Sequence, residues 1–388
     1  MKSYAILGGG IIGLSLAYKL LLNDSKNKVV VYEKEPNPGI HQSTRNSGVI
    51  HCGLSYTPGS LKARLSYEGS KQLKIFCKEN LIDIDHCGKI VVDQSINVLE
   101  QLARYGEKNG LKGLQILNKL EIKKLEPNLN SNIGLLVPEE SVVDYKQVIL
   151  KLKELILIKG GQIVCNFNIL EHLEISKNII GNEKYSYIIN AAGLYSDKVF
   201  TILTGNKLDS QIIPFRGEYY ALKEDHSDLF SNLIYEAPNS DFPFLGIHFT
   251  KHINGLKSIG PNAVLAFKRE GYSIFDFDSK EFIESLSFKG LQKFILKNPK
   301  FCLKELYSSL NKDVFIKQAK KYFPEIKNSM FEKKIFSGVR AQSVGKSGNL
   351  ILDFKIIKSQ NKIHIINSPS PGASSSLAFA DFLINSYL

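Results

Sequence analysis

The sequence predicts an α/β fold of two domains, one built on a parallel sheet and the other on an antiparallel sheet. Three observations lead to this prediction. A strand, a glycine turn and a helix open the chain, a second apolar strand ends in small residues near position 190, and strictly alternating strand character begins near position 212. Parallel and antiparallel signals in separate stretches of one chain indicate two layered units rather than one.

The first observation is the glycine-rich turn. Tyr4–Leu7 is a short apolar run, and Gly8-Gly9-Gly10-Ile11-Ile12-Gly13 follows it at once and matches G-x-G-x-x-G. A helical stretch, a second apolar run and Glu33 come next, in the order and spacing of a dinucleotide-binding βαβ unit of the Rossmann type. We expect Gly8 to permit the tight turn, Gly10 to admit a pyrophosphate, and Gly13 to let the helix pack on the strand.

The residues near the end of this unit limit which nucleotide can bind. The helix N-terminus offers unpaired N–H groups to phosphates, and Glu33 lies where a carboxylate can accept hydrogen bonds from both ribose hydroxyls. An acid at this position disfavours a 2′-phosphate, so NAD or FAD is preferred over NADP. The motif alone leaves NAD and FAD open.

The composition is that of an ordinary globular protein. The chain has 388 residues, of which 43% are hydrophobic and 23% charged, and Lys+Arg minus Asp+Glu is 50 − 38 = +12. The excess lysines are scattered, and no basic run is interleaved with aromatic residues, so we expect no nucleic-acid partner. No stretch of eighteen apolar residues is present, which excludes a conventional membrane span but leaves peripheral contact with a membrane open.

The five cysteines are odd in number, irregularly spaced and without a C-x-x-C pair. This pattern is typical of reduced thiols in a cytoplasmic protein, and it predicts neither a disulfide framework nor a metal site. We therefore expect a cytoplasmic location, with attachment to the inner face of the cell membrane left open.

The middle of the chain alternates between helical and strand periodicity. Expected helices are 61–80, 96–109, 120–125, 143–159, 275–298 and 303–323. Expected strands are 133–137, 163–164 and 214–222, with a strand pair over 82–92 that is broken at 87–88. Residues 170–175 and 179–181 read as a hairpin, and the strand-like stretch at 245–249 belongs to the second domain.

Two further strands return the chain to the first domain. The strand at 187–190 runs into Ala192 and Gly193, small residues that let the backbone pass close to a ligand. Near the C-terminus a strand precedes Ser370-Pro371-Gly372-Ala373-Ser374, where a helix begins and a second polar site is expected. The predicted nucleotide domain is thus discontinuous (1–80, 141–212 and 333–388), and 81–140 with 213–332 form a substrate or cap domain. Because three segments would contact one long ligand along its whole length, this arrangement favours FAD over NAD.

Longer sequence strings carry a family resemblance that covers nearly the whole chain. They are HQSTRNSGVIHCG (41–53), Pro58–Ala63, Pro214–Tyr219, Leu245–His248, Gly260–Tyr272, Gly338–Gln342 and Pro369–Ala373. On these strings the chain resembles the FAD-dependent oxidoreductases of the D-amino-acid oxidase and glycerol-3-phosphate dehydrogenase type, and within them the L-2-hydroxyglutarate dehydrogenases and oxidases. Thr44, where relatives often carry Gly, is a departure.

The resemblance implies a fold, a cofactor and an activity. It implies a Rossmann-like FAD domain of the D-amino-acid-oxidase/glutathione-reductase type, and FAD-dependent oxidation of L-2-hydroxyglutarate or a close L-2-hydroxy acid to the 2-oxo acid. It places the 41–53 loop beside the flavin. The cofactor contacts it implies, besides the glycine turn and Glu33, are Lys34, Ser43, Arg45, Asn46, Ser47 and Gly48, with the 192–193 and 370–374 segments.

The chemistry of a 2-hydroxy acid then selects the remaining candidates. A base must take the hydroxyl proton, and histidine suits this role near neutral pH, which points to His51 and His248. Cations must hold the carboxylates, and Arg216 and Arg340 are candidates for that clamp, with an interdomain salt bridge as the alternative. The secondary candidates for substrate contact are Lys268 and Tyr235 at the distal carboxylate, and Tyr56 at the pocket mouth.

Other activities remain open at this point. The same fold could oxidise an amine or an amino acid, or resemble a glycerol-3-phosphate dehydrogenase. An RNA-related role rests only on the net charge of +12. The electron acceptor, whether quinone or oxygen, is not indicated by the residues.

Overall fold

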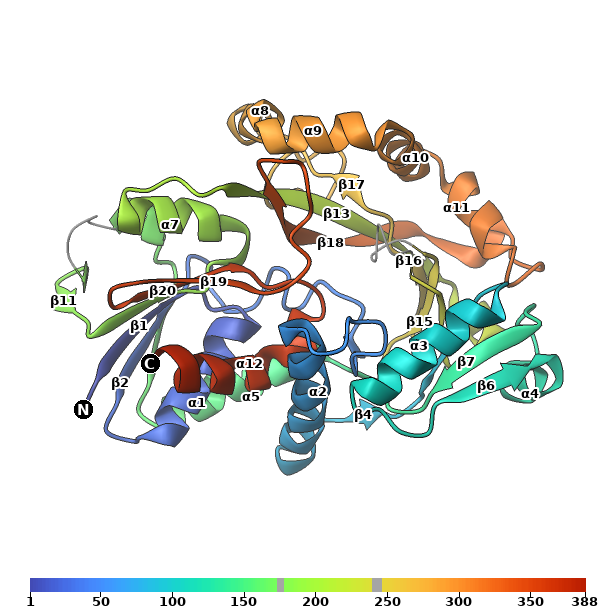
Figure 1. Cartoon of the computed structure of the whole chain (residues 1–388), viewed down its shortest axis with the longest axis horizontal. Coiled ribbons are helices and arrows are strands. Elements are labelled where there is room, and N and C mark those ends of the chain that lie inside the picture. The colour runs from blue at the N-terminus through green and yellow to red at the C-terminus, as the bar shows by residue number, and fades with distance from the viewer. Residues whose placement is uncertain (173–177, 239–245) are drawn as a thin grey trace.

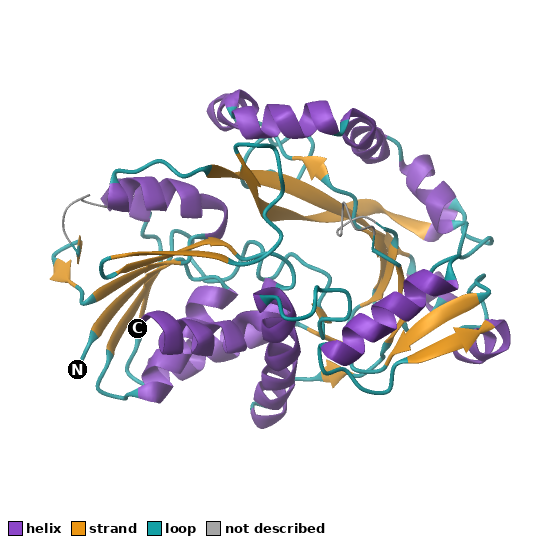
Figure 2. Cartoon of the chain, viewed as in Figure 1, coloured by secondary structure: helices purple, strands orange, loops and turns teal. Residues whose placement is uncertain are grey.

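The computed structural model describes residues 1–172, 178–238 and 246–388. It contains two large sheets side by side, one at each end of an elongated molecule (Figure 1). Helices cover the lower face of the first sheet, and a row of four helices runs along the outer side of the second sheet (Figure 2). The expected two-domain α/β architecture is confirmed.

The first sheet has six strands in the order β19-β20-β12-β1-β2-β9. Its strands are β1 (Ser3–Leu7), β2 (Lys28–Tyr32), β9 (Gln162–Val164), β12 (Tyr187–Asn190), β19 (Lys355–Ser359) and β20 (Lys362–Asn367). All neighbours are parallel except β19, which runs antiparallel to β20. Strands from the two ends of the chain and from its middle therefore meet in one sheet.

Helices cover both faces of this sheet. They are α1 (Ile11–Asn23), α2 (Leu61–Glu79), α5 (Tyr145–Ile158), α6 (Ile169–His172), α7 (Ser196–Thr204) and α12 (Gly372–Tyr387). Helix α1 is apolar on nearly all sides because it packs against both α5 and α12 as well as the sheet. The core between them includes Ile6, Leu14, Val31 and Phe379, all fully buried.

The second sheet has nine strands in the order β17-β13-β16-β15-β14-β5-β7-β6, with β18 pairing on β13. Its strands are β5 (Lys89–Val92), β6 (Gln115–Asn118), β7 (Ile133–Val137), β13 (Ser210–Leu222), β14 (Leu233–Glu236), β15 (His248–Lys251), β16 (Lys257–Gly260), β17 (Val264–Leu265) and β18 (Phe331–Gly345). Only the β14–β5 contact is parallel. The predicted antiparallel character is thus confirmed for the described strands.

The helices of this second part are α3 (Ile96–Lys108), α4 (Lys119–Leu125), α8 (Ser279–Ser287), α9 (Lys289–Lys297), α10 (Pro299–Leu310) and α11 (Lys312–Ala319). The single helix expected over 275–298 begins later and is divided at Phe288, which ends α8 and precedes α9. Pro299 opens α10 instead of ending a helix, because the missing N–H of proline costs nothing at the first helical position.

Two small strand groups complete the fold. A three-stranded sheet joins β3 (Val49–Ile50), β8 (Ser141–Val143) and β4 (Ile84–Asp85), and a hairpin joins β10 (Ile179–Ile180) and β11 (Glu183–Lys184). The hairpin expected from 170 is wrong at its start, since residues 169–172 are helical; the expected positions 173–175, like Leu245, lie outside the described residues.

The sheets do not divide the chain where we expected the boundary at 332/333. Strand β18 spans 331–345 and pairs along most of its length with β13, so these residues belong to the second sheet. The first domain resumes with β19. Ion pairs are among the contacts that join the domains: Arg269 lies 2.7 Å from Asp197 on α7, and Glu270 lies 2.7 Å from Lys34.

Among the described helices, none combines the length and the apolar character needed to cross a bilayer. All five cysteines are free thiols, two of them buried.

Candidate active site

A long channel crosses the first domain and opens into a cavity between the two sheets. One part is lined by Glu33, Lys34 and residues of 167–170, and the other, of about 370 Å³, by His51 and residues of both sheets. The two parts share five lining residues, namely Gly10, Gln42, Ser43, Ala191 and Gly193. The two parts therefore form one continuous space that extends from Glu33 to His51.

The glycine turn leaves no room for side chains. Gly8 has a φ of +114°, and a Cβ there would lie 2.5 Å from the carbonyl oxygen of Ala191. A Cβ on Gly13 would lie 2.1 Å from the carbonyl oxygen of Gly8, which shows how closely α1 approaches β1. Gly10 caps the helix and lines both parts of the channel. The turn therefore has the close backbone approach that a pyrophosphate requires.

Glu33 lines the part of the channel that lies away from His51. Its carboxylate accepts hydrogen bonds from the backbone N–H of Gly9 at 2.8 Å and of Glu35 at 3.0 Å, so its orientation is fixed. The neighbouring Lys34 forms ion pairs with Glu35 and Glu270, and His41 contacts the same two carboxylates. Lys34 therefore compensates part of the negative charge of these two carboxylates at the edge of the channel.

The 41–53 loop reaches the cofactor channel through several of its side chains. Ser43 accepts a hydrogen bond from the N–H of Ile11, at the start of α1. Asn46 instead holds the loop itself, donating to backbone carbonyls of the loop and accepting from the N–H of Gly48. Arg45 stacks on the ring of Tyr272 at 4.0 Å. Of the loop positions expected at the cofactor, those that line the channel are Ser43, Arg45, Asn46 and Ser47.

The N-terminus of α12 forms the opposite wall. Residues 370–374 all line the cavity. Ser374 Oγ accepts a hydrogen bond from the N–H of His51 at 3.0 Å and lies 3.0 Å from the hydroxyl of Tyr145. The C-terminal segment thus fixes the backbone of the first candidate base.

His51 is held by a buried carboxylate that the sequence analysis did not identify. Strands β3 and β8 pair antiparallel with Ile50 opposite Ser141, so the next residues along, His51 and Glu140, face one another. Glu140 Oε2 lies 3.1 Å from His51 Nδ1, and Glu140 Oε1 accepts a hydrogen bond of 2.6 Å from Lys89 Nζ. Burial by itself would raise the pKa of Glu140, but Lys89 and His51 outweigh it and hold this pKa well below its usual range.

The second candidate base has a different environment. The His248 ring stacks on Tyr235 with centroids 3.7 Å apart, and Tyr235 also meets His51 edge-on. Burial, together with the nearby charges of Arg340, His51 and Lys89, lowers the pKa of His248 well below its ordinary value. His248 is therefore neutral at working pH and a much weaker base than a histidine supported by a carboxylate.

Arg340 and Lys62 are two of the cationic side chains that line the cavity. Arg340 lines the cavity and is hydrogen-bonded to Tyr219; burial raises the pKa of Tyr219, and the guanidinium offsets part of that effect. Lys62 also lines the cavity, with its ammonium 4.3 Å from the centre of the Tyr56 ring. Burial lowers the pKa of Lys62 to about 8, although Asp353 acts in the opposite direction.

Arg216 and Lys268 are absent from the residues that line this cavity. The register of β13 and β18 sets Arg340 opposite Phe215, on the face shared with Gly217 and Tyr219, whereas Arg216 points to the other face. There Arg216 is buried and paired with Glu218 at 3.0 Å. We therefore withdraw Arg216 and Lys268 as substrate contacts and retain Arg340.

Sequence reasoning missed several cavity residues, among them Glu140, Lys89, Lys62 and Tyr219. Tyr219 had a usable signal, because it follows Gly217 at strand spacing. Lys62 lies within one of the strings that carried the resemblance. No sequence signal pointed to Glu140 or Lys89, since they stand 89 and 38 positions from His51 and lie in no motif.

Comparison with known proteins agrees with this geometry. A family model described as FAD dependent oxidoreductase matches residues 3–385. The L-2-hydroxyglutarate dehydrogenase of Indibacter alkaliphilus is 42% identical, over 96% of this chain and 95% of that protein. The human mitochondrial L-2-hydroxyglutarate dehydrogenase is 36% identical, over 97% and 87% respectively.

Solved structures show the same fold at low sequence identity. FAD-bound L-α-glycerophosphate oxidase from Mycoplasma pneumoniae superposes with a TM-score of 0.75 at 22% identity, covering 99% of this chain and 94% of that one. Glycine oxidase from Geobacillus kaustophilus gives a TM-score of 0.71 at 14% identity, covering 99% and 94%. The chain belongs to the FAD dependent oxidoreductase family and, within it, to the L-2-hydroxyglutarate dehydrogenases.

Proposed function

We propose that this protein oxidises L-2-hydroxyglutarate to the 2-oxo acid with FAD as its cofactor. The observation that carries the proposal is the His51–Glu140 pair, located where the cofactor channel meets a cavity lined by Arg340. Relatives that cover nearly the whole chain have this activity in their names. When bound, FAD accepts the α-hydrogen of the substrate as a hydride.

His51 is the proposed base. With Nδ1 engaged by Glu140, the other ring nitrogen, Nε2, takes the hydroxyl proton of the substrate. Glu140 selects this tautomer and stabilises the imidazolium that forms. Lys89 keeps Glu140 ionised in its buried position. His248 and Tyr235 form an aromatic wall that excludes water and limits the positions the substrate can adopt.

Two carboxylates of the substrate require two cationic contacts. We assign the carboxylate next to the reacting carbon to Arg340, whose planar guanidinium can bind it through two parallel hydrogen bonds. The distal carboxylate is assigned to Lys62, with Tyr56 beneath its ammonium. Lys89 contributes little to substrate binding because its charge is already compensated by Glu140.

The two electrons removed from the substrate need a final acceptor, and we propose a quinone or oxygen for this role. The net charge of +12 is consistent with peripheral contact with an anionic membrane on its cytoplasmic face, where a quinone would be available.

The decisive experiment is anaerobic reduction of the purified protein. Its flavin absorbance should bleach on addition of L-2-hydroxyglutarate and remain unchanged with the D-enantiomer. Glycine, sarcosine, proline and glycerol 3-phosphate are the controls for an amine oxidase or a glycerol-3-phosphate dehydrogenase. Bleaching by one of these and by no 2-hydroxy acid would overturn the proposal.

A further inference from the structure

Helix α10 buries two polar side chains and exposes a stripe of apolar ones. A helix that packs on a sheet normally buries its apolar stripe. In α10 the fully buried side chains are Glu305 and Ser308, and Glu305 accepts a hydrogen bond from the N–H of Ala263 beneath it. Near the start of α10, Phe301 and Cys302 pack against the core of the second sheet, but the remaining apolar side chains of the helix face solvent.

The exposed stripe of α10 has regular helical spacing. Leu303, Leu306, Tyr307 and Leu310 stand at i, i+3, i+4 and i+7, and each is between 39% and 67% exposed. Leu296, on the preceding helix, is 79% exposed. Both helices pack against strands of the second sheet, so these side chains lie on the side turned away from that sheet. We call these five residues the α9–α10 face.

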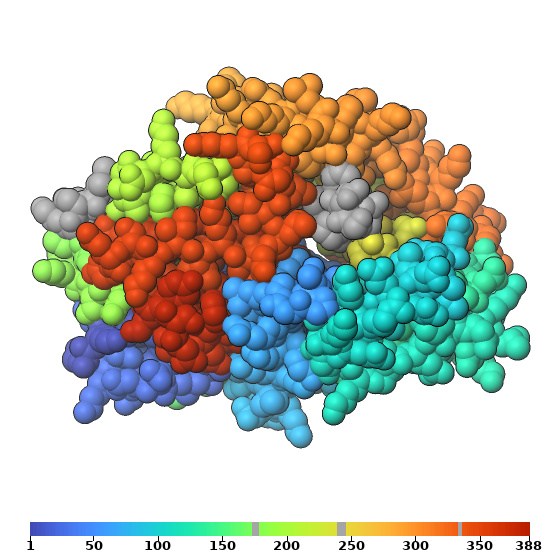
Figure 3. All heavy atoms as spheres, in the orientation of Figure 1, coloured from blue at the N-terminus to red at the C-terminus, as the bar shows by residue number. Residues whose placement is uncertain are grey.

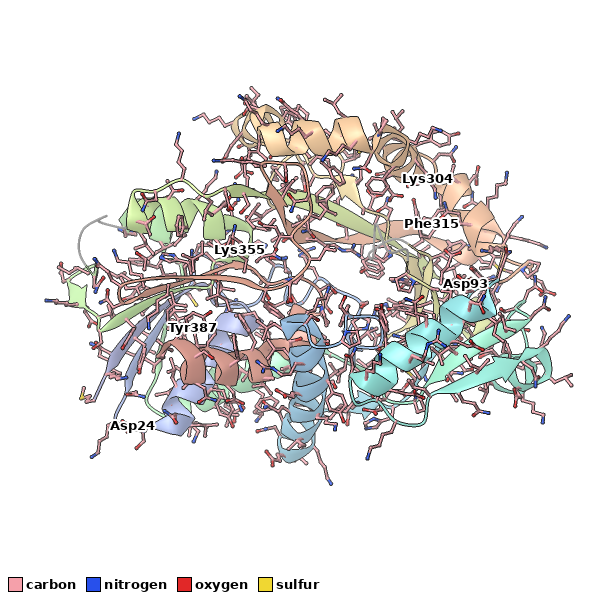
Figure 4. The ribbon with its side chains drawn as sticks, viewed as in Figure 1. Asp24, Asp93, Lys304, Phe315, Lys355 and Tyr387 are labelled. Carbon is pink, nitrogen blue, oxygen red and sulfur yellow. The ribbon has the colours of Figure 1, made fainter. Side chains whose placement is uncertain are left out.

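Lysines surround this apolar face. Residues 289–310 contain five of them, all exposed: Lys289, Lys293, Lys297, Lys300 and Lys304. The one acidic residue in this stretch, Glu305, is buried. Figure 3 shows the row of helices as the upper rim of the molecule, and Figure 4 labels Lys304 on this rim.

We propose that the α9–α10 face docks on an anionic lipid surface, with its apolar side chains inserted among the acyl chains and its lysines at the headgroups. This gives the membrane contact proposed above a location, and it rests on that part of the proposed function. Apolar side chains projecting from helices and ringed by lysines are the pattern of interfacial attachment.

The charge argues against a second copy of this chain as the occupant. In a two-fold contact the same surface faces itself, so five lysines would be brought against five lysines with no exposed acid from residues 289–310 to compensate them. An anionic bilayer supplies the missing negative charge and an apolar phase together.

Vesicle flotation of the purified holoenzyme tests this inference. We expect binding to phosphatidylcholine vesicles that contain one quarter phosphatidylglycerol, and at least tenfold less binding to phosphatidylcholine alone. Two variants should each lower binding at least tenfold: Leu303→Ser/Leu306→Ser/Leu310→Ser and Lys293→Glu/Lys297→Glu/Lys300→Glu/Lys304→Glu. All substituted side chains are exposed, so flavin content and melting temperature should match those of the parent protein.

A matched control lies on α5, where Leu150 and Leu157 are also exposed. The Leu150→Ser/Leu157→Ser variant should bind vesicles like the parent. Equal binding to neutral vesicles, unchanged binding by the α10 variants, or a dimer that only the leucine variant loses would each overturn the inference. Anaerobic flavin reduction in lipid-free buffer, measured on the same preparations, reports separately on the proposed activity.

Discussion

His51 Nδ1 lies 3.1 Å from Glu140 Oε2, although the two residues are 89 positions apart. The pairing of β3 with β8 brings them together, and Lys89 at the start of β5 completes a line of three charged or polar groups. The proposed base is thus set in place by backbone pairing and by a buried ion pair, both independent of the substrate.

Replacing His51 by Ala should preserve the flavin and slow its reduction. Loss of a general base costs at least about 100-fold, because the hydroxyl proton no longer has a positioned acceptor. Rapid-mixing measurement of anaerobic flavin bleaching by L-2-hydroxyglutarate gives the rate. His248→Ala, which removes a neutral stacked ring, should slow reduction much less. The reverse ranking of these two variants would transfer the base role to His248.

Glu140→Gln should slow the same step by about 10- to 100-fold, the usual effect of removing the partner that orients a functional histidine. The neutral amide can no longer stabilise the imidazolium, and it leaves Lys89 buried without its counter-charge. The melting temperature should therefore fall as well. Glu139→Gln is the matched control and should alter neither property. A Glu140→Gln protein that is less stable yet reduced at the parent rate would show that Glu140 has only a structural role.

The affinity for substrate should decrease in alkaline solution. Since burial lowers the pKa of Lys62 to about 8, its ammonium is charged below that pH and neutral above it. The KM for L-2-hydroxyglutarate should rise as pH increases through 8, by about tenfold for one lost charged hydrogen bond. Lys62→Met should show the high KM already at pH 7 and little further change. A pH dependence that persists in Lys62→Met would assign it to another group.

Substitutions of Arg340 and Arg216 should affect different properties, the first KM and the second stability. Arg340→Lys should raise KM about tenfold, because a single ammonium cannot reproduce the two-point contact of a guanidinium. Arg216→Met should leave KM unchanged and lower the free energy of unfolding by about 3 kcal/mol or more, since the buried carboxylate of Glu218 loses its ion-pair partner. Steady-state kinetics of both variants gives KM, and urea unfolding gives the free energy of unfolding. A raised KM in a stable Arg216→Met protein would show that Arg216 does contact the substrate.

Gly13→Ala should yield protein without flavin. The added Cβ would lie 2.1 Å from the carbonyl oxygen of Gly8, so α1 must move away from the turn that receives the pyrophosphate. The ratio of flavin to protein absorbance after purification measures the effect. Ser15→Ala, two residues along the same buried helix, removes no hydrogen bond recorded for its hydroxyl and should retain the flavin.

Local patterns in the sequence were sufficient for much of the fold. The turn from Gly8 to Gly13 and the strand at 133–137 could be predicted because each depends on neighbouring residues. Glu140 and Lys89 could not, because their contact with His51 arises from strand pairing between distant segments. For the same reason the sequence alone did not show that β18 belongs to the second sheet.

The position of Arg216 was a different kind of error. Arg216 and Glu218 are two residues apart on a strand, so they share a face, and their opposite charges could have suggested an internal ion pair. Gly217 and Tyr219 define the opposite face, which is the one that lines the cavity. Strand parity, applied to the same residues, would have separated Arg216 from Arg340.

The hydrogen bond between His51 and Ser374 spans 323 positions and has a consequence for biosynthesis. On the ribosome, the glycine turn and the base emerge early, whereas β20 and α12 emerge last. Until they do, the nascent chain presents β12 as an open strand edge and lacks one wall of the channel. The complete cofactor site can therefore form only after β20 and α12 have been synthesised, and a chain cut short before β20 would be a flavin-free product exposed to aggregation and proteolysis.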